Sequence, residues 1–94
     1  MQYLRVESMK SPRTGNAVAN QFAIYTQEGV YFQSYQTIIA FWPTGESKIM
    51  LDENSWDYSR TTLKYLKRFL KTNSSKSDIE RSIKLGDFKL ANLN

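Results

Sequence analysis

The chain has 94 residues, no cysteine, no histidine and a formal net charge of +4. This length predicts one modest core in a single domain, residues 1–94, and the 40% hydrophobic content is enough to fill it. Without cysteine and histidine there is no disulfide, thiolate nucleophile or common general base, so we expect a non-enzymatic protein without metal or cofactor.

The sequence also predicts where the protein works and what it meets. No apolar run approaches the roughly 18 residues of a membrane span, and residues 1–10 carry charges where a signal peptide is apolar. We therefore expect a cytoplasmic monomer or small homo-oligomer with no membrane partner. Residues 51–94 carry nine Lys or Arg against six Asp or Glu, a balance that suits nucleic acid or an acidic protein surface.

The N-terminal part is predicted to contain an edge strand and a hairpin. Residues 1–9 alternate as a short strand, and residues 11–20 hold turn residues typical of a loop. Residues 21–26 and 30–35 alternate with a period of two, and residues 27–29 make a short loop between them. This pattern indicates an antiparallel pair of strands.

Two more strands are predicted after this hairpin. TIIAFW, residues 37–42, is apolar enough for a central strand. PTGE, residues 43–46, has the composition of a turn, and SKIML, residues 47–51, is expected to return as the next strand.

An amphipathic helix is predicted to follow, because apolar residues recur three and four positions apart. Ser59 is the preferred N-cap, although the helix could also begin at Asn54 or Ser55. Its apolar face holds Leu63, Leu66, Phe69 and Leu70. The opposite face holds five cations and no carboxylate, namely Arg60, Lys64, Lys67, Arg68 and Lys71.

A second, short helix is predicted near the C-terminus. Ser77 and Glu80 have the spacing of a capping box, and Gly86 is a suitable stop. Residues 87–93 could form a strand or an extended tail. The fold we expect is α+β, with an antiparallel sheet of four or five strands, one long amphipathic helix packed on a face and this short C-terminal helix.

The cationic helix face is the strongest functional candidate. Five cations on one rigid face can neutralise phosphates and release their counterions. A solvated helix face is the alternative reading, since surface helices carry charge and cations favour a helix C-terminus. The absence of carboxylates favours binding, because like charges on one face repel each other without i,i+4 partners.

Two other groups have simpler structural readings. Aromatic residues on the strands could stack bases, but they more often form core and cross-strand pairs; they are Tyr25, Tyr31, Tyr35, Phe41 and Trp42. The acidic residues Asp52, Glu53 and Asp57 could hold Mg²⁺, but they are more typical of the start of a helix. A nucleophile at Ser59, Thr61 or Thr62 would have only a lysine such as Lys64 as its base.

Short motifs between residues 20 and 70 occur in a distinctive combination. They are NQF (20–22), FQSY (32–35), IA (39–40), LD (51–52), WDYS (56–59), TT (61–62), KY (64–65) and FL (69–70). In this combination the chain resembles short uncharacterised proteins of bacteriophages and related mobile elements. The resemblance implies a phage-type protein in the bacterial host cytoplasm, and it implies no reaction.

Polar members of this pattern predict a site at the junction between sheet and helix, with Arg60 and Lys64 at its rim. The residues expected to lie together are Gln33, Tyr35, Trp56, Tyr58 and Thr62. They could form a buried hydrogen-bonded network or, if open to solvent, a binding site for a phosphate or a single strand.

The sequence leads to three hypotheses of function. The first is a non-catalytic accessory protein that binds nucleic acid, or a nucleic-acid-bearing host complex, through the basic helix face. The second is a protein-binding inhibitor of a host enzyme or defence system, similar to anti-CRISPR proteins. The third is a structural or assembly component of a phage particle.

Overall fold

The computed structural model describes residues 3–45 and 48–94, which form six strands and two helices. The strands are β1 (Tyr3–Lys10), β2 (Ala17–Thr26), β3 (Gly29–Ser34), β4 (Thr37–Pro43), β5 (Ile49–Asp52) and β6 (Phe88–Ala91). The helices are α1 (Arg60–Leu70) and α2 (Lys76–Lys84). Met1, Gln2, Glu46 and Ser47, which we assigned to the first strand, a turn and the returning strand, lie outside the described residues.

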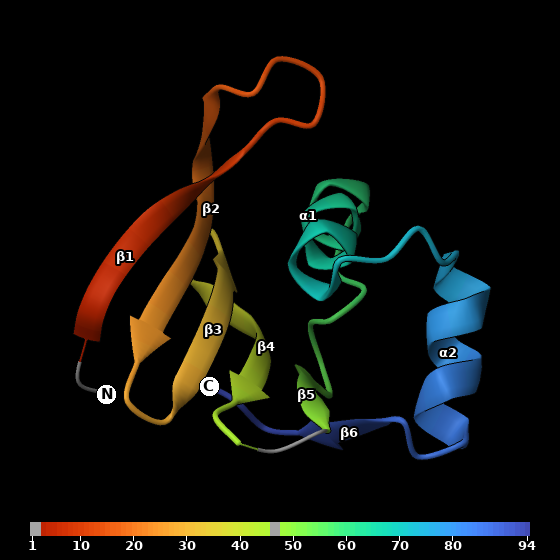
Figure 1. The fold of residues 1–94 in the computed structure, drawn as a ribbon. Helices are drawn as coiled ribbons and strands as arrows, with labels where there is room; N and C mark the ends of the chain where they lie inside the picture. Colours follow the sequence, from red (N-terminus) through yellow and green to blue (C-terminus); the bar gives the residue numbers. More distant parts are fainter. Residues whose placement is uncertain (1–2, 46–47) are drawn as a thin grey trace.

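All six strands belong to one mixed sheet, in the order in which they follow each other along the chain. Strands β1 to β5 pair antiparallel, whereas β6 lies parallel to β5, with Leu90 opposite Leu51. The expected antiparallel sheet of four or five strands is therefore wrong. A parallel pair needs a long crossover connection, and α1 and α2 together supply it between β5 and β6 (Figure 1).

The expected single long helix is also wrong, because the two helices are short and similar in length. Helix α1 has 11 residues and ends at Lys71, whose backbone is left-handed with φ 58°. Helix α2 has nine residues. Its capping box joins Ser75 and Asp78 rather than Ser77 and Glu80, so the helix begins earlier than predicted. Gly86 follows its end with φ +85°, as predicted.

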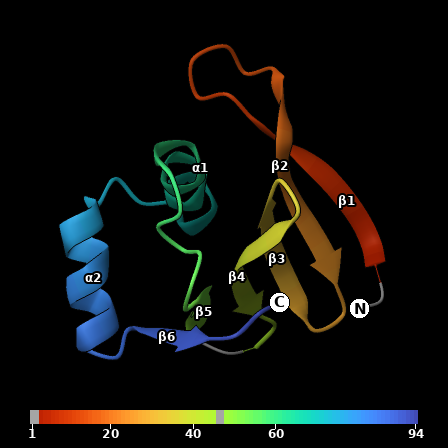
Figure 2. The ribbon, with the colours of Figure 1, turned by 180° about the vertical axis from the view of Figure 1, so that it is seen from behind.

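Helix α1 packs on one face of the sheet, and the core lies between them (Figures 1 and 2). Phe32, Leu51 and Leu66 have no exposed surface, and the ring of Phe32 stacks on that of Phe69 at 5.7 Å between centroids. Helix α2 lies farther out and contributes Ile79 to this core. Because its apolar side faces the sheet, α1 turns its cationic side to solvent.

The β1–β2 hairpin extends beyond the shorter strands, and its loop curves above α1 (Figures 1 and 2). Strand β2 begins at Ala17, so residues 17–20, which we predicted as loop, belong to the sheet. Strand β1 pairs with β2 and lies at the edge of the sheet, as predicted. Side chains of the long hairpin and of the C-terminal half of α1 line a common hollow.

The C-terminal residues form a strand and a pinned tail. Beyond β6, the Leu93 N–H donates to Asp52 Oδ1 at 2.9 Å. The Asn94 side chain accepts from the Ile38 N–H at 2.8 Å and donates to the Ile38 carbonyl at 3.0 Å. These bonds fix the tail across the ends of β4 and β5.

Candidate functional site

The cationic face of α1 begins from a well-formed cap. Ser59 is the N-cap, as predicted, and its hydroxyl accepts from the Thr62 N–H at 3.1 Å. Counting from this cap, the helical period brings all five cations to the outer side, where four are exposed and Lys67 is half-buried. Lys67 and Arg68 lie in the last turn, where the helix dipole favours positive charge.

These five cations have no carboxylate partner among residues 3–45 and 48–94. The two ion pairs in that part of the chain join Arg5 to Glu7 at 2.9 Å and Lys76 to Asp57 at 3.5 Å. Lys64 Nζ lies 5.5 Å from the centroid of the Tyr65 ring, a contact that does not neutralise its charge. The face therefore presents five positive charges to solvent.

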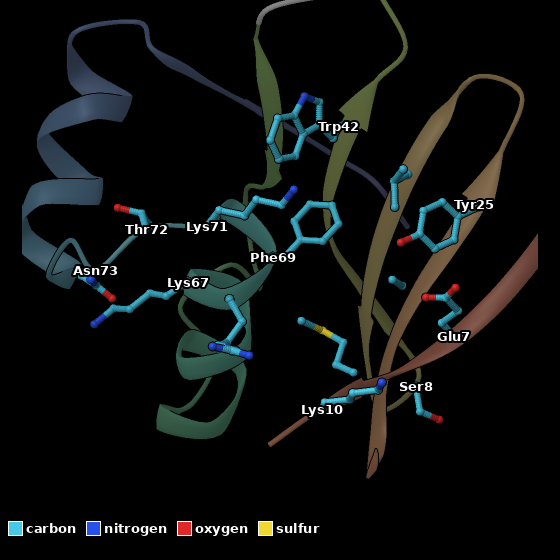
Figure 3. A pocket seen from close by; sticks show the side chains of 14 residues that line it. Glu7, Ser8, Lys10, Tyr25, Trp42, Lys67, Phe69, Lys71, Thr72 and Asn73 are labelled. Atoms are coloured by element: carbon cyan, nitrogen blue, oxygen red, sulfur yellow. The ribbon is translucent and has the colours of Figure 1, made fainter. Parts of the chain in front are cut away.

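A groove of about 740 Å³ separates the C-terminal half of α1 from the β1–β2 hairpin (Figure 3). We call it the basic groove. Lys67, Arg68 and Lys71 line it from α1, and Lys10 and Glu7 line it from β1. Glu7 is already paired with Arg5. The charge that remains in the groove is positive.

The base of the basic groove is apolar and aromatic. Tyr25, Val30 and Trp42 line it from the sheet, in one row of paired residues across β2, β3 and β4. Phe69 lines it from α1 and meets Trp42 edge to face, with 6.2 Å between ring centroids. Met9 of β1 completes this surface. Apolar rings thus lie directly beside the helix cations.

A second hollow, of about 480 Å³, continues along α1. Arg60, Lys64 and Pro12 line it, and it shares Lys67 and Arg68 with the basic groove. Every cation predicted on the helix face therefore lines one of the two adjoining hollows.

The five aromatic residues singled out in the sequence do not share one face. Tyr25 and Trp42 face α1, whereas Tyr31 and Phe41 stack on each other at 4.2 Å on the opposite face. Tyr35 leaves the sheet at a turn, with φ 56°. The five residues therefore do not form one open platform for stacking bases, because adjacent strand positions point to opposite sides.

The predicted polar cluster forms only in part, around a cleft of about 700 Å³ at the N-terminal end of α1. We call it the hydroxyl cleft, after the side chains of Ser34, Tyr35, Tyr58, Ser59, Thr61 and Thr62 that line it. Trp56 is instead buried in the core. Gln33 does not line the cleft, and its Nε2 donates to the Tyr35 carbonyl at 2.7 Å.

Among residues 3–45 and 48–94, no charged side chain lines the hydroxyl cleft. Thr62 Oγ1 lies 3.0 Å from Ser34 Oγ and accepts from Ser59 Oγ at 3.1 Å, so these hydroxyls tie the helix start to β3. Arg60 and Lys64, which we expected at the rim, line the neighbouring hollow instead. The predicted placement of these two cations at the rim of the polar site is therefore wrong.

Asp52 of the acidic cluster supports the structure. Within the described residues, no three carboxylates are placed to hold a metal ion together. Asp52 is buried, which raises its pKa, but hydrogen bonds from the Leu93 N–H, the Ser55 and Asn94 side chains and the Asn54 N–H outweigh this effect. The net result is a pKa below its ordinary value, so the carboxylate stays charged and holds the C-terminal tail.

Sequence reasoning missed the residues that the β1–β2 hairpin contributes to the groove. Lys10 and Met9 line it, as do Thr72 and Asn73 just beyond α1. A strand pattern places a side chain on one face, but it does not show that this face lies across from a particular helix. No signal in the sequence alone identifies Lys10 as a neighbour of Lys67 and Arg68.

No helix among the described residues has the length and apolar character needed to cross a membrane.

Comparison with known proteins gives a family. No curated protein and no solved structure gives a significant match. Residues 4–85 match a family of unknown function, DUF8033. Because this match spans most of the chain, the protein belongs to the DUF8033 family.

Proposed function

We propose that this protein binds nucleic acid, or a nucleic-acid-bearing host complex, through the outer face of α1 and the basic groove, without catalysing a reaction. The observation that supports this most is the unpaired state of the five α1 cations within residues 3–45 and 48–94. Their mutual repulsion costs stability, and a polyanion lining up along the helix would relieve it.

The two adjoining hollows support a polyanion rather than a single small anion. Together they run the length of α1, from Arg60 to Lys71. An α-helix rises 1.5 Å per residue, so this face spans about 16 Å, a length that covers several successive phosphates of a nucleic acid strand. The resemblance of residues 20–70 to phage proteins supports the bacterial host cytoplasm as the place of binding.

Salt dependence tests the proposal. Each phosphate contact contributes about −0.7 to −0.9 to the slope of log K against log salt, so five contacts predict a slope near −4. Affinity should then fall roughly 250-fold between about 50 and 200 mM salt. Fluorescence anisotropy with labelled DNA and RNA measures it. Absence of binding at low salt, or binding without a slope, would refute the proposal.

A second candidate function is favoured by the tyrosines at the hydroxyl cleft. Tyr58 is 76% exposed and Tyr35 is 52% exposed, and exposed tyrosines beside a cleft are common at protein interfaces. In this alternative the chain binds and inhibits a host protein. A pull-down from bacterial lysate, with and without nuclease, separates the two, because only this alternative predicts a protein partner retained after nuclease treatment.

A further inference from the structure

We propose that the basic groove receives an unpaired base on Trp42, so that the ligand is a single strand rather than a duplex. This inference rests on the proposed function and narrows its substrate class. It is drawn from three kinds of side chain that the groove brings together: cations on one wall, an aromatic surface at the base and hydrogen-bonding groups on the other wall (Figure 3).

The cations are placed for a sugar-phosphate backbone. Lys67, Arg68 and Lys71 follow each other along one wall, and the left-handed backbone at Lys71 ends the helix so that this wall is a helix C-terminus. Figure 3 shows the Lys71 side chain extending toward Phe69. A phosphate bound by these cations would therefore lie next to the aromatic surface.

Trp42 is the ring placed to stack a base. It is half-buried, its edge-to-face contact with Phe69 fixes its orientation, and its row partner Val30 supports it from β3. The Gly29 backbone lies so close to that of Trp42 that a Cβ at Gly29 would collide with the carbonyl oxygen of Trp42. A rigid aromatic surface loses little entropy when a base stacks on it.

Tyr25 has a different role, since one face of its ring is already covered. The Arg5 guanidinium lies 4.1 Å from the ring centroid, and Glu7 holds Arg5 at 2.9 Å. The Tyr25 hydroxyl points into the groove in Figure 3. With Glu7 beside it, this hydroxyl supplies hydrogen bonds for the polar edge of a base stacked on Trp42.

The size and shape of the groove favour a single strand. A volume of about 740 Å³ lies within the range of pockets that hold small organic ligands, so a nucleotide fits. A duplex keeps its bases stacked inside and offers phosphates to the cations, but it cannot lay a base on Trp42. The inferred contact is therefore available only to unpaired nucleotides.

Intrinsic fluorescence tests the inference. The chain has two tryptophans, and Trp56 is 7% exposed, so Trp56→Phe leaves Trp42 as the reporter. This variant, and the wild type as a second measurement, are titrated with a labelled single strand, its duplex and the same strand with abasic sites. Anisotropy reports binding, and tryptophan emission reports stacking.

We expect the single strand to quench Trp42 emission in parallel with binding and to bind about tenfold or more tightly than the duplex or the abasic strand, which leave emission unchanged. Trp42→Leu should lower affinity for the single strand by about tenfold or more and leave duplex affinity within about twofold. If Trp42→Leu does not fold, the quenching in the wild type and in Trp56→Phe still decides the question.

The possible failures are distinguishable. Binding of the single strand without quenching, or duplex binding that is equally tight, would overturn the inference but leave the proposed function standing. No binding by any oligonucleotide at low salt would overturn both. DNA and RNA single strands both supply an unpaired base for Trp42. Comparing their affinities would therefore identify which of the two is the ligand.

Discussion

The basic groove and the hydroxyl cleft lie at opposite ends of α1 and have similar volumes, about 740 and 700 Å³, but their charge differs. Lys67, Arg68 and Lys71 line the groove, whereas the cleft is lined by hydroxyls, amides and one apolar side chain. Like charges are tolerated best at a helix C-terminus, where the dipole favours cations. The comparison teaches that a cationic surface for a polyanion costs the least stability at the end of the helix where the dipole already favours positive charge.

The largest expected effect is on the groove. Lys67→Glu, Arg68→Glu and Lys71→Glu together should weaken nucleic acid binding by about 100-fold or more and reduce the salt slope by about 2 to 2.7, because three phosphate contacts are lost. The matched control is Arg81→Glu, Lys84→Glu and Lys89→Glu, exposed cations that do not line either hollow. Anisotropy titrations compare the two. Equal loss in both variants would show that net charge, rather than the groove, carries binding.

The next effect concerns the cleft. Thr62→Val removes the hydroxyl that bonds Ser34 and Ser59, and should lower the free energy of unfolding by about 1 to 3 kcal/mol. Thr61→Val is the control, because Thr61 is exposed and should change stability by no more than about 0.5 kcal/mol. Urea unfolding measures both. If nucleic acid affinity fell as well, the two ends of α1 would not be independent.

A buried amide on the cleft side gives a change of opposite sign. Gln21 is 1% exposed, lies beside Ser34 in the sheet, and has no hydrogen-bond partner for its amide among the described protein atoms. Gln21→Leu should raise the free energy of unfolding by about 1 kcal/mol, since an unsatisfied polar group is removed. Gln33→Leu is the control. It loses the hydrogen bond to the Tyr35 carbonyl and should not raise the free energy of unfolding. Destabilisation by Gln21→Leu would contradict the prediction.

The smallest effect expected is a pH dependence of the Asp52 contacts that hold the C-terminal tail. The pKa of Asp52 is lower in the folded chain than its ordinary value of 3.8, so the unfolded chain takes up protons first as pH falls. The stability from this carboxylate is present above pH 3.8 and is lost as pH falls through the folded pKa. Hydrogen exchange at the Leu93 amide should rise in this window before exchange in the core does. Asp52→Asn should remove that pH dependence.

The local features of the chain were predictable because they depend on neighbours in sequence. Ser59 caps α1, TIIAFW is a central strand and Gly86 follows the last helix, as the turn, cap and apolar patterns indicate. The predicted capping box lies two residues beyond the observed one, because both Ser75 with Asp78 and Ser77 with Glu80 have suitable spacing. Local patterns left that choice open.

What the sequence determined by itself is the α+β composition, the positions of most strands and a cationic helix face, because periodicity of two or 3.6 residues assigns side chains to faces. Only the tertiary structure decided that β6 lies parallel to β5, that Tyr25 and Trp42 share a face without Tyr31, and that Lys10 lies across from Lys67. These are contacts between distant segments. They follow from how faces pack on one another, which a one-dimensional pattern does not contain.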